Sequence, residues 1–452
     1  MKLTNKEKIS YGFGAVGKDM VYSIVSGYLL YYYNTVLGIS ATFVGVLFMA
    51  ARIFDAFNDP FMGIVVEKTN TRMGKFRPWL LIGTITNAVI LVLMYMVPKG
   101  VNGTGLLVYV SVAYILWGVT YTIMDIPFWS MIPAITQTGK DRENLSVIGR
   151  SCASVGFAVP TVLTMVVVPI LGGGSERRGF AIFAMIIAAF FLIAESVTVL
   201  NVKEKVRVKQ ETVSVSEMIR ALFKNDQALI VVTAIIVFNA SLYLTQQLAI
   251  YFFKYDIGNA ELVSLFGAVG GGVQIVSMML LPLFRKKFET KDILKGAISV
   301  TIVGYLFMFI LGALHKNNIV LLCIAAMIIF FGFGLATVLT TIFLADTVDY
   351  GEWKNGQRSE SVIFSLQTFV VKLASAVSAL IAGVGLDVIK LDQEAAVQSA
   401  YTTTGLRILM LGFPMVGLVI SIIFFTRKYK LDETMLKKIT EELKNRKDNL
   451  NM

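Results

Sequence analysis

Residues 43–66 read FVGVLFMAARIFDAFNDPFMGIVV, an apolar run about as long as a helix that crosses a bilayer. Three charged side chains nevertheless interrupt the run: Arg52, Asp55 and Asp59. A charge at the centre of a bilayer costs about 2.5–3.5 kcal/mol on an insertion scale. We therefore expect these side chains to face a cavity or one another, on a membrane-spanning helix that carries a polar site.

Apolar runs like this one recur along the whole chain of 452 residues. The sequence is 56% hydrophobic and only 16% charged, whereas an average soluble protein has about 25% charged residues. Since a span needs about 20 mostly apolar residues, the sequence predicts an all-α membrane protein with roughly twelve spans. The predicted spans are residues 12–33, 43–66, 80–97, 106–132, 148–171, 179–200, 228–253, 263–283, 293–314, 319–344, 362–389 and 407–425.

The basic residues are distributed unevenly between alternate loops. If the N-terminus is cytoplasmic, 29 Lys and Arg residues lie in the loops and tails on that side, and 6 lie in the opposite loops. Such a bias follows the positive-inside rule. The formal net charge of +11 therefore indicates orientation in a membrane rather than a nucleic-acid partner. We predict a multi-pass protein of the cytoplasmic membrane with both termini in the cytoplasm and lipid as its surroundings.

A long polar segment divides the chain near its middle, with six predicted spans on each side. Two such halves are typical of secondary transporters, which bind substrate near the midplane of the bilayer. Apolar residues at helical spacing near the end of the chain predict a surface helix there. The predicted organisation is an N-terminal six-helix bundle (1–200), a cytoplasmic middle loop (201–226), a C-terminal six-helix bundle (227–426) and a cytoplasmic tail (427–452).

The charges inside the spans are too many to face lipid. In lipid they would together cost roughly 20–28 kcal/mol, which exceeds the usual net stability of a fold, about 5–15 kcal/mol. Four are positive and four negative, so they could pair as structural locks between helices or line a binding site. They are Lys18, Asp19, Arg52, Asp55, Asp59, Asp125, Arg150 and Lys372.

Spacing points to a cation site in the second span. Asp55, Asn58 and Asp59 stand at i, i+3 and i+4 and share one helix face. Pro60 follows at once and frees a backbone carbonyl nearby. Two close carboxylates at low dielectric stay ionised only if a cation compensates them, so we predict a monovalent cation or a proton there. Arg52 could instead be the partner of a neighbouring carboxylate.

The fourth predicted span carries a pattern suited to a polyhydroxylated ligand. Thr122, Asp125 and Trp129 share one helix face, where a carboxylate can accept hydrogen bonds from hydroxyls and an indole can cover an apolar C–H face. Trp129 and Tyr121 could equally be core residues. Other polar side chains within the spans that could join such a site are Lys18, Asp19, Arg150, Gln367, Thr368 and Lys372.

Six stretches together resemble one family of membrane transporters. They are YGFGAVGKD (11–19), ARIFDAFNDPFMG (51–63), GKFRPWLLIG (74–83), WGVTYTIMDIPFWSMIP (117–133), ADTVDYGEW (345–353) and SLQTFVVK (365–372). In this order they resemble the melibiose permease group of the glycoside–pentoside–hexuronide:cation symporters. That family belongs to the major facilitator superfamily, whose fold packs about 12 membrane helices in two six-helix bundles.

The resemblance implies a role for each matching residue. The family binds Na⁺, Li⁺ or H⁺ at positions that match Asp55 and Asp59, with Asn58 and Thr122 nearby. When the coupling cation is Na⁺ or Li⁺, it is the metal ion that the resemblance implies. The resemblance implies no other cofactor. The family holds its sugar through positions that match Lys18, Asp19, Tyr121, Asp125, Trp129, Arg150, Thr368 and Lys372.

The sequence departs from the melibiose pattern at two aromatic positions. Thr337 stands where the melibiose carriers have a Trp in span ten, and Ser26 where they have a Tyr in span one. The loss of two rings reshapes the pocket, so a galactoside, a pentoside or a glucuronide is each a candidate substrate.

Two other functions remain open from the residues. The first is a cation-coupled lysolipid or amphiphile transporter, because lysolipid carriers resemble this group and the two missing rings leave room for an acyl chain. The second is a membrane sensor that binds a ligand without moving it. An enzyme is not expected, because the sequence has no nucleophile–base pair, no cofactor motif and no catalytic metal cluster.

Overall fold

The computed structural model describes residues 3–136, 140–204, 215–314, 318–355, 360–393, 395 and 397–450. These residues form helices joined by short connections, and their one β-bridge is an isolated pair between Thr71 and Gly74. Within them, eleven helical segments are long and apolar enough to cross a membrane. The first long helix is not among the eleven, because Lys18 and Asp19 lie at its centre. The predicted all-α membrane fold is confirmed.

The chain divides into two compact units, Met1–Thr212 and Val213–Met452. The finer domain limits proposed from the sequence stay predictions, and residues 205–214 of the expected middle loop lie outside those described. The described part of that loop contains a short helix, α7 (Val215–Lys224).

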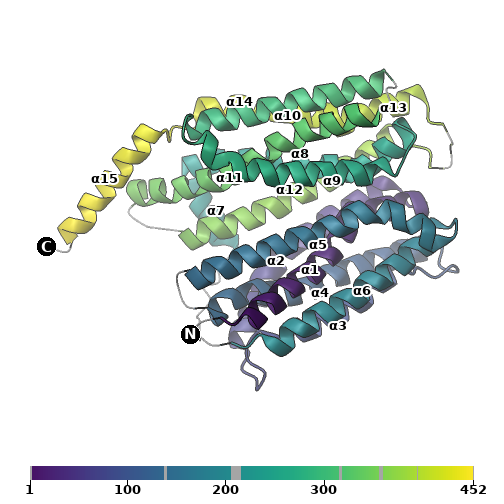
Figure 1. Cartoon of the computed structure of the whole chain (residues 1–452), viewed down its shortest axis with the longest axis horizontal. Coiled ribbons are helices and arrows are strands. Elements are labelled where there is room, and N and C mark those ends of the chain that lie inside the picture. Colours follow the sequence, from purple (N-terminus) through teal and green to yellow (C-terminus); the bar gives the residue numbers. More distant parts are fainter. Residues whose placement is uncertain are drawn as a thin grey trace. The chain divides into compact units, whose positions relative to one another are not determined.

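Six long helices build the first unit. α1 packs against both α5 and α6, α3 packs against α4 and α6, and α2 packs against α4 (Figure 1). α1 begins at a capping box, in which the Thr4 side chain and the Glu7 side chain each satisfy a backbone N–H of the other. The helices are α1 (Asn5–Tyr31), α2 (Ala41–Lys68), α3 (Arg77–Tyr95), α4 (Gly103–Ile135), α5 (Lys140–Gly172) and α6 (Glu176–Asn201).

The second unit contains α7 and a further set of long helices, followed by a C-terminal helix. α11 packs against α9 and α10, while α8 packs against α12 and α14. The remaining elements are α8 (Asp226–Tyr251), η2 (Phe252–Asp256), α9 (Leu262–Phe284), α10 (Thr290–Ala313), α11 (Ile319–Asn355), α12 (Glu360–Val388), α13 (Ala400–Arg407), η3 (Ile408–Gly412), α14 (Phe413–Lys428) and α15 (Glu433–Leu450).

The first long membrane helix of each unit, α1 or α8, ends in the same way. Residues 28–38 read YLLYYYNTVLG and residues 248–258 read LAIYFFKYDIG, an offset of 220 residues. In both, an α-helix widens into one π-helical turn, η1 (Tyr32–Val36) or η2, and a glycine of positive φ then ends it. Glycine is needed there because other side chains disfavour that backbone region. The shared offset supports an internal repeat of the two units.

The repeat does not extend to the charges of α1. At the same offset, Lys18 and Asp19 correspond to Phe238 and Asn239 of α8. Phe238 lines a small, mainly apolar cavity of about 20 Å³ in the second unit. The buried charges of the first helix are therefore a property of the first unit only.

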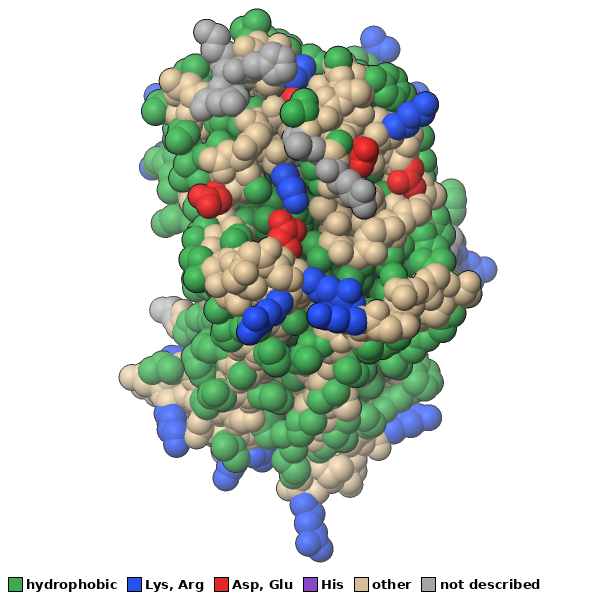
Figure 2. Space-filling view, turned by 90° about the vertical axis from the view of Figure 1, so that its right-hand side faces the viewer, with side chains coloured by type: hydrophobic (Ala, Val, Ile, Leu, Met, Phe, Trp, Pro, Cys, Tyr) green, Lys and Arg blue, Asp and Glu red, His purple; other side chains and the backbone are tan. Residues whose placement is uncertain are grey.

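The surface and the C-terminal helix agree with a membrane setting. On the face that Figure 2 shows, hydrophobic side chains cover much of the surface. α15 forms the predicted amphipathic helix, and Leu431 just before it and Ile439 within it are buried. Trp353 of α11 donates a 2.6 Å hydrogen bond to Glu442, which attaches this helix to the second unit.

Candidate functional site

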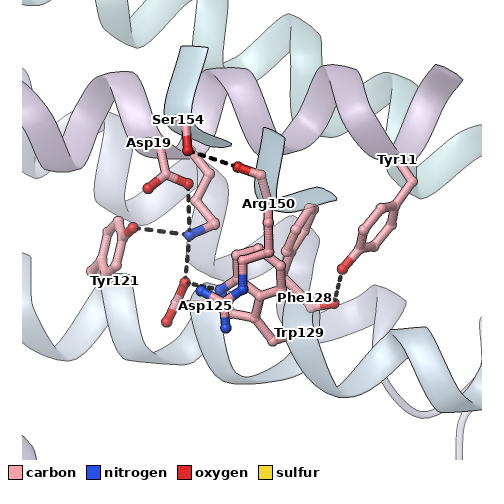
Figure 3. Close-up of polar contacts among 9 residues, drawn as sticks. Tyr11, Asp19, Tyr121, Asp125, Phe128, Trp129, Arg150 and Ser154 are labelled. Atoms are coloured by element: carbon pink, nitrogen blue, oxygen red, sulfur yellow. Dashed lines mark hydrogen bonds and ion pairs between the residues drawn. The ribbon is translucent and has the colours of Figure 1, made fainter. Parts of the chain in front are cut away.

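Lys18 is the centre of a buried polar cluster in the first unit. Figure 3 labels its neighbours Asp19, Tyr121 and Asp125. Its ammonium lies 2.7 Å from Asp125 Oδ1 and 3.1 Å from Asp19 Oδ2, and only 3% of its side chain is exposed. It also donates a 3.2 Å hydrogen bond to the Tyr121 hydroxyl. Two carboxylates therefore share one ammonium, and Asp125 keeps part of its surface open, with 27% of its side chain exposed.

Trp129 and Arg150 form the other side of the cluster. The Trp129 indole N–H donates a 3.1 Å hydrogen bond to the same Asp125 oxygen that binds Lys18. The Arg150 guanidinium lies 4.2 Å from the centre of the indole ring, within the range of a cation–π contact. Arg150 is exposed, and Figure 3 shows its guanidinium beside the Trp129 indole and the Asp125 carboxylate. An aromatic ring, a carboxylate and an exposed guanidinium thus lie side by side.

Helix periodicity explains how three elements meet here. Tyr121, Asp125 and Trp129 are spaced four residues apart, so they project from one face of α4. α1 supplies Lys18 and Asp19, and α5 supplies Arg150. α1 and α5 can approach because residue 156 is Gly: a Cβ there would collide with the carbonyl oxygen of Val16.

The predicted cation residues form a second polar group, between α2 and α4. Arg52 donates a 3.3 Å hydrogen bond to Asp55, and both side chains are buried. Thr122 of α4 donates a 3.1 Å hydrogen bond to Asp59. Asn58 lies between the two carboxylates in sequence and is half-buried. The structure thus brings oxygen ligands from both helices together, the donor set that a hard cation prefers.

Two features hold Asp55 and Arg52 in place. α4 has Gly118 opposite Asp55, and a Cβ there would lie 3.0 Å from Asp55 Oδ1, so a larger residue would press on the carboxylate. The Arg52 guanidinium lies 5.5 Å from the Tyr22 ring centre and 5.8 Å from that of Trp117. The alternative that Arg52 pairs with a neighbouring carboxylate is therefore confirmed in this structure.

Thr368 and Lys372 belong to the second unit. They lie one turn apart on α12, with Thr368 exposed and Lys372 half-buried. Their neighbour Gln367 donates a 3.2 Å hydrogen bond to Thr341 of α11. Their predicted role with the residues of the first unit stays a prediction.

The two positions that lack aromatic rings carry hydroxyls turned back to their own helices. Thr337 donates a 2.7 Å hydrogen bond to the Phe333 carbonyl, and Ser26 a long, 3.4 Å one to the Ser23 carbonyl. Neither hydroxyl replaces the surface that a ring would offer to a ligand.

One buried carboxyl was missed in the sequence. Glu195 of α6 is fully buried, yet it was not counted among the span charges. The signal was a single acid inside the apolar run 179–200, close to the predicted end of that span.

Known proteins resemble this chain over nearly its full length. A family described as MFS/sugar transport protein matches residues 10–433. The chain is 30% identical over 449 residues to the uncharacterized symporter YjmB of Bacillus subtilis, covering 98% of this chain and 96% of that protein. It is 30% identical over 439 residues to the isoprimeverose transporter of Lactiplantibacillus pentosus, an alignment that covers 95% of this chain and 90% of that transporter.

The fold is also that of solved transporters. A crystal structure of the nucleoside transporter NupG superposes with a TM-score of 0.69 and covers 93% of this chain and 100% of that one. Its identity of 15% shows likeness of fold alone.

Fold, buried charges and relatives together define a multi-pass membrane transporter, not an enzyme. The chain belongs to the MFS/sugar transport protein family, within the major facilitator superfamily, and the resemblance seen in its motifs is confirmed.

Proposed function

We propose that the protein is a symporter that couples the movement of Na⁺, Li⁺ or H⁺ to that of a glycoside sugar by alternating access. The sugar binds at Lys18, Asp125, Trp129 and Arg150, and the cation binds at Asp55 and Asp59. The cation is cargo of the cycle rather than a resident cofactor. The name of the isoprimeverose transporter supports a sugar of the pentoside class as one candidate.

A single observation carries this proposal: one helix touches both polar groups. Thr122 of α4 binds Asp59 at 3.1 Å, and Asp125, three residues later on α4, binds Lys18 at 2.7 Å. Residues three apart on a helix share a face. A cation that draws Asp59 and Thr122 together therefore acts on the backbone that orients Asp125 and Trp129.

This arrangement offers a physical route for coupling. A bound cation compensates the paired carboxylates and favours one position of α4, and sugar binding at Asp125 favours a position of the same helix. By linkage, the factor by which the cation strengthens sugar binding equals the factor by which sugar strengthens cation binding. Reciprocal binding measurements therefore test the coupling directly.

The experiment that tests the function is uptake into vesicles containing the purified protein. The labelled panel is isoprimeverose, melibiose, a methyl-β-xyloside, a β-glucuronide and a lysolipid, with a Na⁺, Li⁺ or proton gradient imposed in turn. We expect one glycoside to accumulate with one cation. Accumulation of the lysolipid alone would replace the sugar by an amphiphile, and binding without exchange in counterflow would indicate a sensor.

Matched variants connect the result to the cation residues. Asp59→Cys and Asp55→Cys should abolish uphill accumulation while leaving some sugar binding. Asp292→Cys removes an exposed carboxylate that pairs with Lys295 at 2.9 Å, and should leave accumulation unchanged. Full cation-driven accumulation in both Asp55 and Asp59 variants would contradict the assignment.

We further propose that the protein lies in the cytoplasmic membrane with both termini in the cytoplasm. The excess of Lys and Arg in alternate loops supports this orientation. Labelling of single Cys residues placed near each terminus by a membrane-impermeant thiol reagent, from outside the cell, would contradict it.

A further inference from the structure

Glu195 is a buried acid that the proposed transport mechanism does not use. It lies on α6, its exposed fraction is 0%, and neither of its carboxyl oxygens has a hydrogen-bond partner among the residues that the structure describes. A buried ionised carboxylate is tolerated when it is paired or accepts hydrogen bonds. Glu195 has neither form of compensation.

The packing of α1 explains the missing donors. α1 presents Gly14 to Glu195: a Cβ on Gly14 would collide with the Thr198 hydroxyl and lie 3.3 Å from the carboxyl carbon of Glu195. The nearby hydroxyls donate elsewhere, because Thr198 donates to the Ser10 carbonyl at 2.8 Å and Tyr11 to the Phe128 carbonyl at 3.0 Å. The close approach of α1 therefore places a glycine, which has no side-chain donor, beside the carboxyl.

The charges around Glu195 also favour a neutral carboxyl. Lys18, Asp125 and Asp19 act on it electrostatically, but Lys18 is already bound by both aspartates. Arg150 also acts on Asp19. An ionised Glu195 would make three carboxylates against two cations, whereas a proton on Glu195 leaves two against two. The titratable side chains on helices packed against α6 that bear on this region are Tyr11, Lys18 and Asp19 of α1, Arg77 of α3, and Arg150 and Cys152 of α5.

We propose that Glu195 is a proton-binding site, separate from the carboxylate pair of α2, whose bound proton balances the charge of the Lys18 cluster. The proposed ligand is H⁺, because a proton removes the charge of a buried carboxylate to which the described residues donate no hydrogen bond. At neutral pH the Glu195 carboxyl carries this proton. At alkaline pH it releases the proton, and the cluster then holds an unbalanced negative charge.

Infrared spectroscopy of the full-length protein in lipid vesicles tests this, since a protonated carboxyl and a carboxylate absorb at separate positions. We expect the wild-type protein to show a protonated-carboxyl band at neutral pH that disappears reversibly as the pH is raised. Glu195→Gln should remove this band, and Glu261→Gln, which alters an exposed carboxylate, should leave it. Glu195→Asp keeps the acid and should shift the band, which provides a second test if the Gln variant does not fold.

Two results would overturn the proposal: a neutral-pH spectrum that Glu195→Gln leaves unchanged, or a band that stays constant over the whole pH range in which the protein is folded. The measurement uses no sugar. Its failure is therefore distinct from a failure of the proposed sugar transport, which would show as absent uptake with the infrared band intact.

Discussion

Arg52 holds Asp55 in an ion pair of 3.3 Å on one turn of α2, and neither side chain is more than 9% exposed. The guanidinium therefore pairs with one of the two carboxylates that we propose as ligands of the cation. A cation that binds between Asp55 and Asp59 has to share Asp55 with Arg52 or displace it. In this state of the protein, Arg52 would therefore compete with the cation that we propose for this carboxylate pair.

Removal of the Arg52 guanidinium should make the thermal stability of the protein depend more on Na⁺. Arg52→Gln leaves a buried carboxylate without its partner, and loss of one member of a buried pair costs about 3–5 kcal/mol. Because a ligand stabilises the state that binds it, added NaCl should raise the melting temperature of Arg52→Gln more than that of the wild type. Thermal unfolding in NaCl against choline chloride at equal ionic strength measures this difference.

Arg52→Lys is the control for this prediction, since it keeps a positive charge beside Asp55. Its response to Na⁺ should stay close to that of the wild type. An equal Na⁺ response in all three proteins would mean that Arg52 and the cation do not compete for Asp55.

The Thr122 hydroxyl should contribute directly to cation affinity. It donates a 3.1 Å hydrogen bond to Asp59, and a hydrogen bond to a charged group is worth about 1.5–3 kcal/mol. Thr122→Val keeps the shape and removes a hydroxyl oxygen that we propose as a ligand of the cation. A loss of similar size would lower cation affinity by at least about tenfold. Cation titrations of sugar binding measure the change, and Thr122→Ser should retain most of the affinity. A Ser variant as weak as the Val variant would assign the loss to packing instead.

The indole of Trp129 has two separable roles. Its N–H orients Asp125 at 3.1 Å, and its ring supports the Arg150 guanidinium at 4.2 Å. Trp129→Phe removes the N–H but keeps a ring, while Trp129→Ala also removes a cation–π contact worth about 0.5–1 kcal/mol at an exposed site. Sugar affinity should fall in the order wild type, Phe variant, Ala variant, as measured by equilibrium binding of the glycoside that accumulates in the uptake panel. Equal affinity in all three would remove Trp129 from the sugar site.

The sequence was informative where one helix carries the whole pattern. Spacing alone placed Asp55 and Asp59 on one face of α2, and Asp125 and Trp129 on one face of α4. Contacts between residues on different helices could not be predicted in this way, because helical spacing contains no information about the neighbouring helix. The contact between Lys18 and Asp125 therefore required the structure.

The fold shows the same division. Length and apolarity predicted the long helices, since a bilayer fixes both. The π-helical turns η1 and η2 were not predicted, because they depend on how the buried aromatic rings at the ends of α1 and α8 pack against other helices. Glu195 was missed for a related reason: a single acid in an apolar run stands out only when the structure shows that its carboxyl oxygens have no hydrogen-bond partner among the described residues.

A last prediction concerns the stability of the second unit. Arg407 of α13 forms two hydrogen bonds with Asp256 of η2, at 2.6 and 2.8 Å, and the Asp256 side chain is 0% exposed. Arg407→Ala leaves that carboxylate buried and alone, so it should destabilise the protein by about 3–5 kcal/mol. Thermal unfolding in detergent measures the loss as a lower melting temperature.

The double variant Arg407→Ala with Asp256→Ala separates the charge effect from the packing effect. If the loss comes from the unpaired carboxylate, removal of Asp256 as well should recover part of the stability. This follows because the net value of a buried ion pair is much smaller than the cost of breaking it on one side. A double variant that is less stable than Arg407→Ala would show instead that both side chains stabilise the unit through contacts of their own, including those beside Gly312, where a Cβ would lie 3.1 Å from Asp256 and 3.2 Å from Arg407.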